Sequence, residues 1–158
     1  MKWGMNMDEK MFSQRVHACA DRFWRISWSI LRNGADCDDA LQNALLCAWR
    51  GIRGLKNDAY FETWLTRILI NESRSLLRKR ARLPGALPEA ICERETPENV
   101  DLSDTLGALE VKLRLPLVLH YMEGYSVKEI SDMLCLPETT VKWRMHAARK
   151  QLRDEWKK

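Results

Sequence analysis

The sequence lacks any long uninterrupted run of apolar residues, although 46% of its 158 residues are hydrophobic. No run approaches the ~20 apolar residues that a membrane-spanning helix needs. The N-terminal segment, MKWGMNMDEKMF, also lacks the apolar core of a secretory signal peptide. We therefore expect a cytoplasmic protein with no direct membrane insertion, whose apolar residues build a core.

Motifs that hold metals or carry out catalysis are missing as well. The five cysteines are odd in number and form no C-x-x-C pair, so we interpret them as reduced packing residues. His17 and Cys19 stand two positions apart in an expected helix, which points their side chains away from each other. The sequence contains neither a phosphate-binding glycine loop nor a pairing of nucleophile and base. We expect a protein that is not an enzyme and that holds neither a metal nor a cofactor.

Strict alternation of apolar and polar residues is absent too, which argues against β-strands and favours an all-α fold. Apolar residues recur at helical spacing over residues 12–31. Asp36 is the expected N-cap of a second helix, and a third helix is expected over residues 59–80 after a loop at residues 51–58. The second helix is expected to bury Leu41, Ala44, Leu45, Ala48 and Trp49.

The charge distribution indicates two modules. The net charge is only +4, but residues 1–82 hold 15 basic and 9 acidic side chains, and residues 111–158 hold 10 basic and 6 acidic ones. Between them, residues 83–110 hold 1 basic and 7 acidic side chains. Two basic blocks on either side of an acidic connector suggest modules that each face a polyanion. We predict two small helical domains at residues 1–82 and 102–158, joined by a flexible linker at residues 83–101.

The second domain is expected to begin with a helix, because leucines recur at helical spacing from Leu102 to Leu113. Pro116 should end or kink this helix, since proline has no backbone N–H to donate. Residues 117–122 are expected to form one more short helix, which Gly124 closes.

Residues 125–153 predict two further helices joined by a tight turn. Ser126 and Glu129 have the spacing of a capping box, in which each side chain satisfies a backbone N–H at the helix start. Pro137 prevents the first helix from continuing. The second helix combines a buried stripe with a basic opposite surface, which is typical of a helix-turn-helix that enters a DNA major groove. That surface carries Thr139, Lys142, Trp143, His146, Ala147, Arg149 and Arg153.

Three stretches, in this order, resemble a known family. Residues 36–49 read DCDDALQNALLCAW, and residues 61–82 read FETWLTRILINESRSLLRKRAR. Residues 115–153 read LPLVLHYMEGYSVKEISDMLCLPETTVKWRMHAARKQLR. The stretches resemble regions 2.2, 2.3–2.4 and 4 of bacterial RNA polymerase sigma factors of the extracytoplasmic-function (ECF) group. The match leaves out little besides the linker and the first ten residues.

The resemblance implies a role for each module. It implies that the first module docks on the β′ clamp helices of core RNA polymerase and opens promoter DNA at the −10 element. It implies that the second module reads the −35 element as duplex and touches the polymerase β flap. It also implies an anti-sigma factor as a partner that holds such a chain inactive.

The resemblance also assigns site residues at matching positions. Holding a melted strand calls for basic groups along the phosphates and for amide and aromatic groups at the bases. Polymerase binding is expected at Asp39, Gln42, Asn43 and Leu46. Contacts with −10 DNA are expected at Lys56, Asn57, Tyr60, Asn71, Arg74 and Arg78. Contacts with −35 DNA are expected at Thr139, Thr140, Lys142, Trp143, Arg144, His146, Ala147 and Arg149.

Several positions depart from the family pattern. Trp143 stands where the family usually has a small residue such as serine, and Ala147 stands where it often has arginine. Thr139 replaces a frequent glycine, and Asn43 replaces a common acidic residue. Leu55 occupies a loop position that is aromatic in some relatives. The DNA sequence that the protein prefers is therefore not predictable from the family.

Two other functions stay open on the residues alone. The chain could be a stand-alone helix-turn-helix regulator that acts as a dimer, or a helical adaptor that binds only protein. A sigma factor should need core polymerase to act, whereas a regulator should bind operator DNA unaided with a two-fold symmetric footprint. An adaptor should show no salt-sensitive affinity for DNA.

Overall fold

The computed structural model describes residues 7–83 and 100–158, with the side chains of the second part described from residue 104 onward. All regular structure in these residues is helical, which confirms the predicted all-α class. Contacts between residues divide the chain into two compact units, Met1–Pro88 and Glu89–Lys158. The predicted linker at residues 83–101 lies almost entirely outside the described residues.

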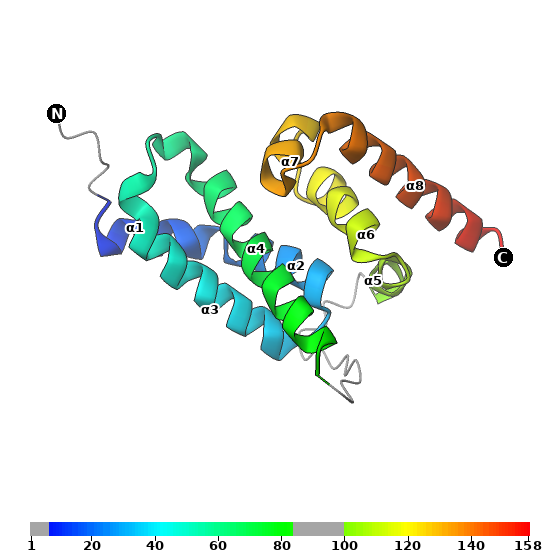
Figure 1. Ribbon diagram of the computed structural model, residues 1–158, viewed down its shortest axis with the longest axis horizontal. Helices are drawn as coiled ribbons and strands as arrows, with labels where there is room; N and C mark the ends of the chain where they lie inside the picture. Colours follow the sequence, from blue (N-terminus) through cyan, green and yellow to red (C-terminus); the bar gives the residue numbers. More distant parts are fainter. Residues whose placement is uncertain (1–6, 84–99) are drawn as a thin grey trace. The chain divides into compact units, whose positions relative to one another are not determined.

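Over residues 7–83, unit 1 contains four helices and two short 3-10 turns. The helices are α1 (Glu9–Ala18), α2 (Ala20–Leu31), α3 (Gly34–Gly51) and α4 (Phe61–Ala81), and the 3-10 turns are η1 (Ile52–Gly54) and η2 (Asp58–Tyr60). Helices α2, α3 and α4 pack against one another (Figure 1). Because α3 presents alanines to the core, its backbone can approach its neighbours closely. Fully buried core residues are Phe23, Ile26 and Ile30 of α2, Ala40, Ala44 and Ala48 of α3, and Leu65, Leu69 and Ile70 of α4.

The buried face of α3 differs from the predicted one. Ala44 and Ala48 are buried as expected, but Leu41 and Leu45 are only half buried, and 40% of Trp49 is exposed. The Trp49 ring instead packs edge-on against Phe12 of α1, with centroids 5.2 Å apart. A helix that meets two neighbours turns its smallest residues toward them and places larger apolar residues at the margin.

The single helix predicted over residues 12–31 is wrong, because the chain breaks at Cys19 into α1 and α2. The Cys19 backbone has φ −108° and ψ 4°, and its N–H donates to the Val16 carbonyl at 3.1 Å. The Cys19 thiol donates to the Glu62 carboxylate of α4 at 3.4 Å, and Arg22 forms an ion pair with the same carboxylate. These contacts come from far along the chain, and apolar spacing alone did not reveal the break.

The prediction that Asp36 caps α3 is also wrong. Asn33 is the N-cap, and its side-chain oxygen accepts a hydrogen bond from the Asp36 N–H at 3.0 Å. The Asp36 side chain is buried and pairs with Arg80 at the end of α4, where Nη2 of Arg80 donates to Oδ1 of Asp36 at 2.7 Å. One cation of the basic run at the end of α4 therefore neutralises a buried carboxylate.

Unit 2 contains α5 (Val100–Gly107), α6 (Val111–Leu117), a π-helical turn η3 (Val118–Met122), α7 (Val127–Leu134) and α8 (Glu138–Trp156). Helix α8 packs on α6 and α7. One buried cluster joins α5, α6, η3 and α8 with the connection between α5 and α6, and it consists of Leu106, Leu109, Leu113, Leu117, Val118 and Ala148. Ile130, Met133, Val141 and Met145 are also buried in this unit.

The start of unit 2 differs from the prediction at two points. The leucine spacing spans two helices, and the buried Arg114 donates to the carbonyl of Leu109 at 2.8 Å in the connection between them. Pro116 lies inside α6, and the chain continues directly into η3, so the separate short helix is wrong. In η3 the Glu123 N–H donates to the Val118 carbonyl at 3.1 Å, the i to i−5 bond of a π-turn.

No helix in residues 7–83 or 100–158 is long and apolar enough to cross a membrane.

Candidate polymerase and DNA interfaces

Helix α3 carries the four predicted polymerase-binding residues on one exposed stripe. The side chains of Asp39, Gln42, Asn43 and Leu46 are all exposed. Their spacing of i, i+3, i+4 and i+7 places them on one face of a helix. Leu46 is 54% exposed and adds an apolar side chain to this otherwise polar stripe. The structure therefore brings these four residues together on a surface that faces away from the core of unit 1.

The loop before α4 presents one exposed aromatic ring. Tyr60 is 62% exposed, and Lys56 and Asn57 are exposed beside it in sequence. The Asn57 side-chain oxygen accepts a hydrogen bond from the Ala59 N–H at 3.0 Å, which leaves the side-chain NH₂ group as a donor. Leu55 is buried, so it cannot serve as a stacking surface for a base.

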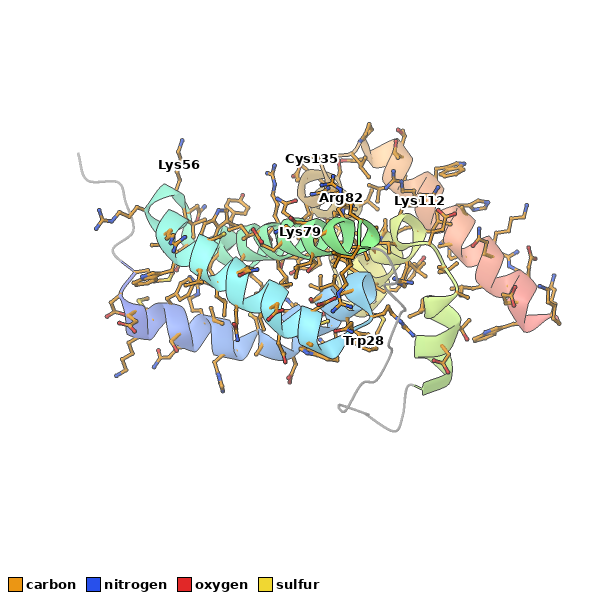
Figure 2. All side chains as sticks on the ribbon, turned by 60° about the horizontal axis from the view of Figure 1, so that its bottom comes forward. Trp28, Lys56, Lys79, Arg82, Lys112 and Cys135 are labelled. Carbon is orange, nitrogen blue, oxygen red and sulfur yellow. The ribbon has the colours of Figure 1, made fainter. Side chains whose placement is uncertain are left out.

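Helix α4 carries the other predicted −10 residues along its length. Asn71 and Arg78 are exposed and Arg74 is half buried, and their spacing places them on one side of the helix. Lys79 and Arg82 follow at its C-terminal end (Figure 2). A helix of 21 residues is about 30 Å long. These groups thus follow a line, which fits an extended strand better than a small molecule.

The helix-turn-helix of unit 2 begins with the predicted capping box, which is confirmed. The Ser126 hydroxyl accepts from the Glu129 N–H at 3.1 Å, and the Glu129 carboxylate accepts from the Ser126 N–H at 2.8 Å. Helix α7 ends at Leu134, and its exposed C-cap residue Cys135 (labelled in Figure 2) adopts the left-handed conformation with φ 53°. Pro137 then precedes the first residue of α8.

Helix α8 exposes most of the predicted −35 residues, but not all of them. Thr140 and Arg144 are half buried. Ala147 is also half buried and packs with Leu152 against the apolar cluster of unit 2. The placement of Ala147 on the exposed surface was therefore wrong, because its position on α8 turns it toward the core. The exposed residues are Thr139, Lys142, Trp143, His146 and Arg149.

Sequence analysis did not single out Tyr121, which contacts a predicted DNA-binding residue. Nη1 of Arg149 donates to the Tyr121 hydroxyl at 2.6 Å, and the guanidinium lies 6.0 Å from the centre of the Tyr121 ring. Tyr121 belongs to the π-turn η3, and 56% of it is exposed. The two residues are 28 positions apart, so no local sequence signal indicates their contact.

Comparison with known proteins identifies the family. The model of Sigma-70 region 2 matches residues 15–83, and the model of Sigma-70, region 4 matches residues 99–152. The ECF RNA polymerase sigma factor SigM of Mycobacterium tuberculosis is 32% identical over 150 residues, which cover 92% of this chain and 76% of SigM. The chain belongs to the ECF sigma factors. Like them, this sigma factor carries region 2 in its first unit and region 4 in its second.

Other relatives agree with this membership. SigW of Bacillus subtilis is 28% identical over 171 residues, covering 93% of this chain and 91% of SigW. SigE of Mycolicibacterium smegmatis is 31% identical, and the chain spans 60% of its length. The solved structure of the sigma factor RpoE with the anti-sigma factor NepR from Bartonella quintana shares the fold, with a TM-score of 0.81 at 23% identity over 94% of this chain and 98% of that one. CnrH in complex with the cytosolic domain of CnrY gives a TM-score of 0.73 at 27% identity, over 95% of this chain and 90% of that one.

The described cysteines of this sigma factor are free thiols. Burial raises the pKa of the Cys37 thiol to about 11, and desolvation and the Glu72 carboxylate raise the pKa of Cys47. Cys47 and Cys135 are exposed, so the interpretation of the cysteines as packing residues was wrong for these two. Cys92 lies outside the described residues. Residues 7–83 and 100–158 contain no group of three His, Cys, Asp or Glu side chains placed to hold a metal ion.

Proposed function

We propose that this protein binds core RNA polymerase, directs it to specific promoters and helps to open the −10 region. The observation that carries the proposal is the order of three exposed surfaces along a chain of this family. They are the polar stripe of α3, the basic line along α4 and the exposed face of α8. We assign the first two to a domain at residues 1–82 and the third to a domain at residues 102–158, with residues 83–101 as the linker.

Polymerase binding is assigned to the α3 stripe. Asp39 supplies a carboxylate, Gln42 and Asn43 supply amides, and Leu46 supplies apolar area at one edge. A rim of polar groups around exposed apolar area suits a protein partner, because the apolar part gains from burial while the polar part sets orientation. The proposed partner surface is the β′ clamp helices, and the β flap is the proposed contact of the second domain.

Promoter opening is assigned to the loop before α4 and to α4 itself. Melting requires that a base leave the stack and be held, at a cost of a few kcal/mol. Tyr60 offers an exposed ring for stacking, and Asn71 offers an amide for a base edge. Arg74 and Arg78 lie on the same side of α4 as Asn71 and are assigned to the phosphates of the melted strand.

Duplex recognition at the −35 element is assigned to α8. Lys142 and Arg149 are exposed and lie seven residues apart, which places them on one flank of the helix. When a helix lies in the major groove, cations on its flank contact backbone phosphates. Such contacts fix the position of the helix on the duplex but do not discriminate between base sequences. The more central surface, at Thr139, Trp143 and His146, is assigned to the base edges.

We also infer an anti-sigma factor as a partner, because the sigma factor RpoE, which shares the fold, was solved in complex with the anti-sigma factor NepR. The proposed activity is that of an initiation factor rather than an enzyme. Its proposed place of action is the cytoplasm, where bacterial promoter DNA and RNA polymerase are found.

The proposal is tested by in vitro transcription from a randomised promoter pool with purified bacterial core polymerase. We expect transcripts only when core polymerase and this protein are both present, and weak binding of promoter duplex by the protein alone. A stand-alone regulator would instead shift DNA unaided and give a two-fold symmetric footprint. Failure to form a complex with core polymerase would overturn the proposed function.

A further inference from the structure

Trp143 is the most exposed large apolar side chain in the first half of α8, with 63% of its surface accessible. The buried residues Val141, Met145 and Ala148 mark the side of α8 that faces the core. At about 100° per residue, Trp143 projects on roughly the opposite side of the helix. It lies in the second turn of α8, in the part of a recognition helix that meets base edges. In a helix docked with this side in the major groove, the indole faces the base pairs.

The neighbours of Trp143 favour DNA over protein as its partner. Thr139, His146 and Lys150 share its side of the helix, and all three are exposed. None of them is a large apolar residue, so Trp143 does not belong to an apolar patch of the kind that docks a protein. An isolated aromatic group among hydroxyl, imidazole and ammonium groups suits a groove in which phosphates surround base edges.

The chemistry of the indole selects one base. Its polar atom, Nε1–H, is a donor and never an acceptor, and the rest of the ring is apolar. In the major groove thymine presents an acceptor, O4, together with an apolar C5 methyl group. Guanine presents two acceptors and adenine presents one acceptor, N7, beside an amino donor, but neither presents an apolar group, and cytosine presents only an amino donor. Thymine is the base that matches both parts of the side chain.

We propose that Trp143 is a specificity-determining residue that reads a thymine in the −35 duplex through the C5 methyl group and O4. The inference rests on the proposed sigma function and adds the base that this chain recognises. A serine at this position could donate a hydrogen bond but could not cover a methyl group, so the substitution sets this chain apart from relatives with a small residue.

The test compares holoenzymes that contain the wild-type chain, Trp143→Ser or Trp143→Phe. Each is reconstituted with the same bacterial core polymerase and selected on a randomised −35 duplex pool. We expect the wild type to enrich thymine at one position where Trp143→Ser does not. At that position, deoxyuridine in place of thymine removes the methyl group alone and should weaken wild-type binding about fourfold, the equivalent of ~0.8 kcal/mol.

The two variants separate the contact with the thymine methyl group from the hydrogen bond to O4. Trp143→Ser should bind the thymine and deoxyuridine duplexes equally. Trp143→Phe keeps an apolar ring but lacks the N–H donor, so it should retain the methyl effect while it binds both duplexes more weakly. At the same position, 5-methylcytosine should bind the wild type better than cytosine does. Thermal unfolding of the free variants checks that the fold survives.

Two results would overturn the inference while the sigma function stands. In the first, the wild type and Trp143→Ser select the same sequences, or deoxyuridine has no effect on the wild type. In the second, Trp143→Ser binds core polymerase more weakly but selects the same DNA sequences as the wild type. This result would show that Trp143 contacts the polymerase instead of the DNA. A wild-type holoenzyme that transcribes no template would instead overturn the proposed function itself, and this inference with it.

Discussion

The guanidinium of Arg149 is held against Tyr121, with a hydrogen bond of 2.6 Å to the phenol oxygen. Tyr121 lies next to His120, whose Nδ1 is 2.8 Å from the Tyr125 carbonyl just before the capping box of α7. The contact therefore links the π-turn before the helix-turn-helix to the exposed flank of α8. An arginine whose orientation is fixed in advance loses less freedom when it binds a phosphate.

Replacing Tyr121 by phenylalanine should weaken DNA binding without unfolding the protein. The variant keeps the ring under the guanidinium and loses the hydroxyl, and both side chains are exposed, so stability should change by less than about 0.5 kcal/mol. Without that hydrogen bond the guanidinium must be ordered when it binds a phosphate, at about 0.5–1.5 kcal/mol, so holoenzyme binding to promoter DNA should weaken about two- to tenfold. Because phosphate contacts carry no sequence information, the loss should be similar across a promoter library.

A double variant tests whether Tyr121 acts through Arg149. Adding Tyr121→Phe to Arg149→Ala should cause little further loss, since the group that Tyr121 orients is already gone. Fully additive losses in equilibrium binding titrations would show that the two residues act independently.

Replacing Cys135 by glycine should stabilise the helix-turn-helix. Cys135 holds φ 53°, a left-handed conformation that costs residues with a side chain about 1–2 kcal/mol. Glycine avoids this cost but is freer in the unfolded chain, so a net gain of about 0.5–1 kcal/mol is expected in urea unfolding. Cys47→Gly is the matched control, because it places glycine inside α3 and should destabilise the protein by a few tenths of a kcal/mol, roughly the difference in helix propensity between cysteine and glycine. Equal effects of both changes would contradict the conformational explanation.

The buried thiol of Cys37 should make stability depend on alkaline pH. Burial raises the pKa of Cys37 in the folded state from 9.0 to about 11. Between these values the unfolded chain has lost the thiol proton while the folded chain still holds it, so stability is full below pH 9 and falls as the pH rises toward 11. The expected loss is at most about 2–3 kcal/mol.

The Cys37 contribution is isolated by comparison with Cys37→Ala. Other groups titrate above pH 9, so both proteins will lose stability, but the loss should be smaller in the alanine variant. The measurement is the free energy of unfolding in urea at several pH values from 8 to 11. Parallel curves for the two proteins would rule out the Cys37 thiol as the cause.

Local signals explain what could be predicted from the sequence. The capping box of Ser126 and Glu129 depends on residues three positions apart, and the structure contains it. The α3 stripe and most of the exposed α8 face follow from the helical period, because buried and exposed positions alternate every three or four residues. The all-α class follows from the same periodicity.

Contacts between distant residues explain what could not be predicted. The break at Cys19 is accompanied by a hydrogen bond to Glu62, and Asp36 is paired with Arg80 in place of capping α3. Each partner lies more than forty positions away, beyond the reach of a periodic pattern. The position of Ala147 was misjudged for a related reason, since the cluster that buries it comes from α5 and α6.

Reversing the charge at Asp39 should weaken assembly with core RNA polymerase while the fold survives. Asp39 is exposed on the α3 stripe with Gln42 and Leu46, so Asp39→Lys changes the proposed interface without disturbing the buried alanine face. A lost charge contact at a protein interface, combined with new repulsion, is expected to weaken binding at least tenfold. The measurement is a titration of fluorescently labelled sigma factor with core polymerase.

Asp38→Lys is the matched control for this prediction. Asp38 is exposed and adjacent, so its replacement alters the charge near the positive end of α3 to the same degree. Its side chain is rotated about 100° around the helix axis from that of Asp39 and therefore lies outside the stripe. We expect near wild-type affinity for core polymerase from Asp38→Lys. Equal weakening by the two substitutions would assign the effect to general electrostatics, and an unchanged affinity of Asp39→Lys would remove Asp39 from the polymerase interface.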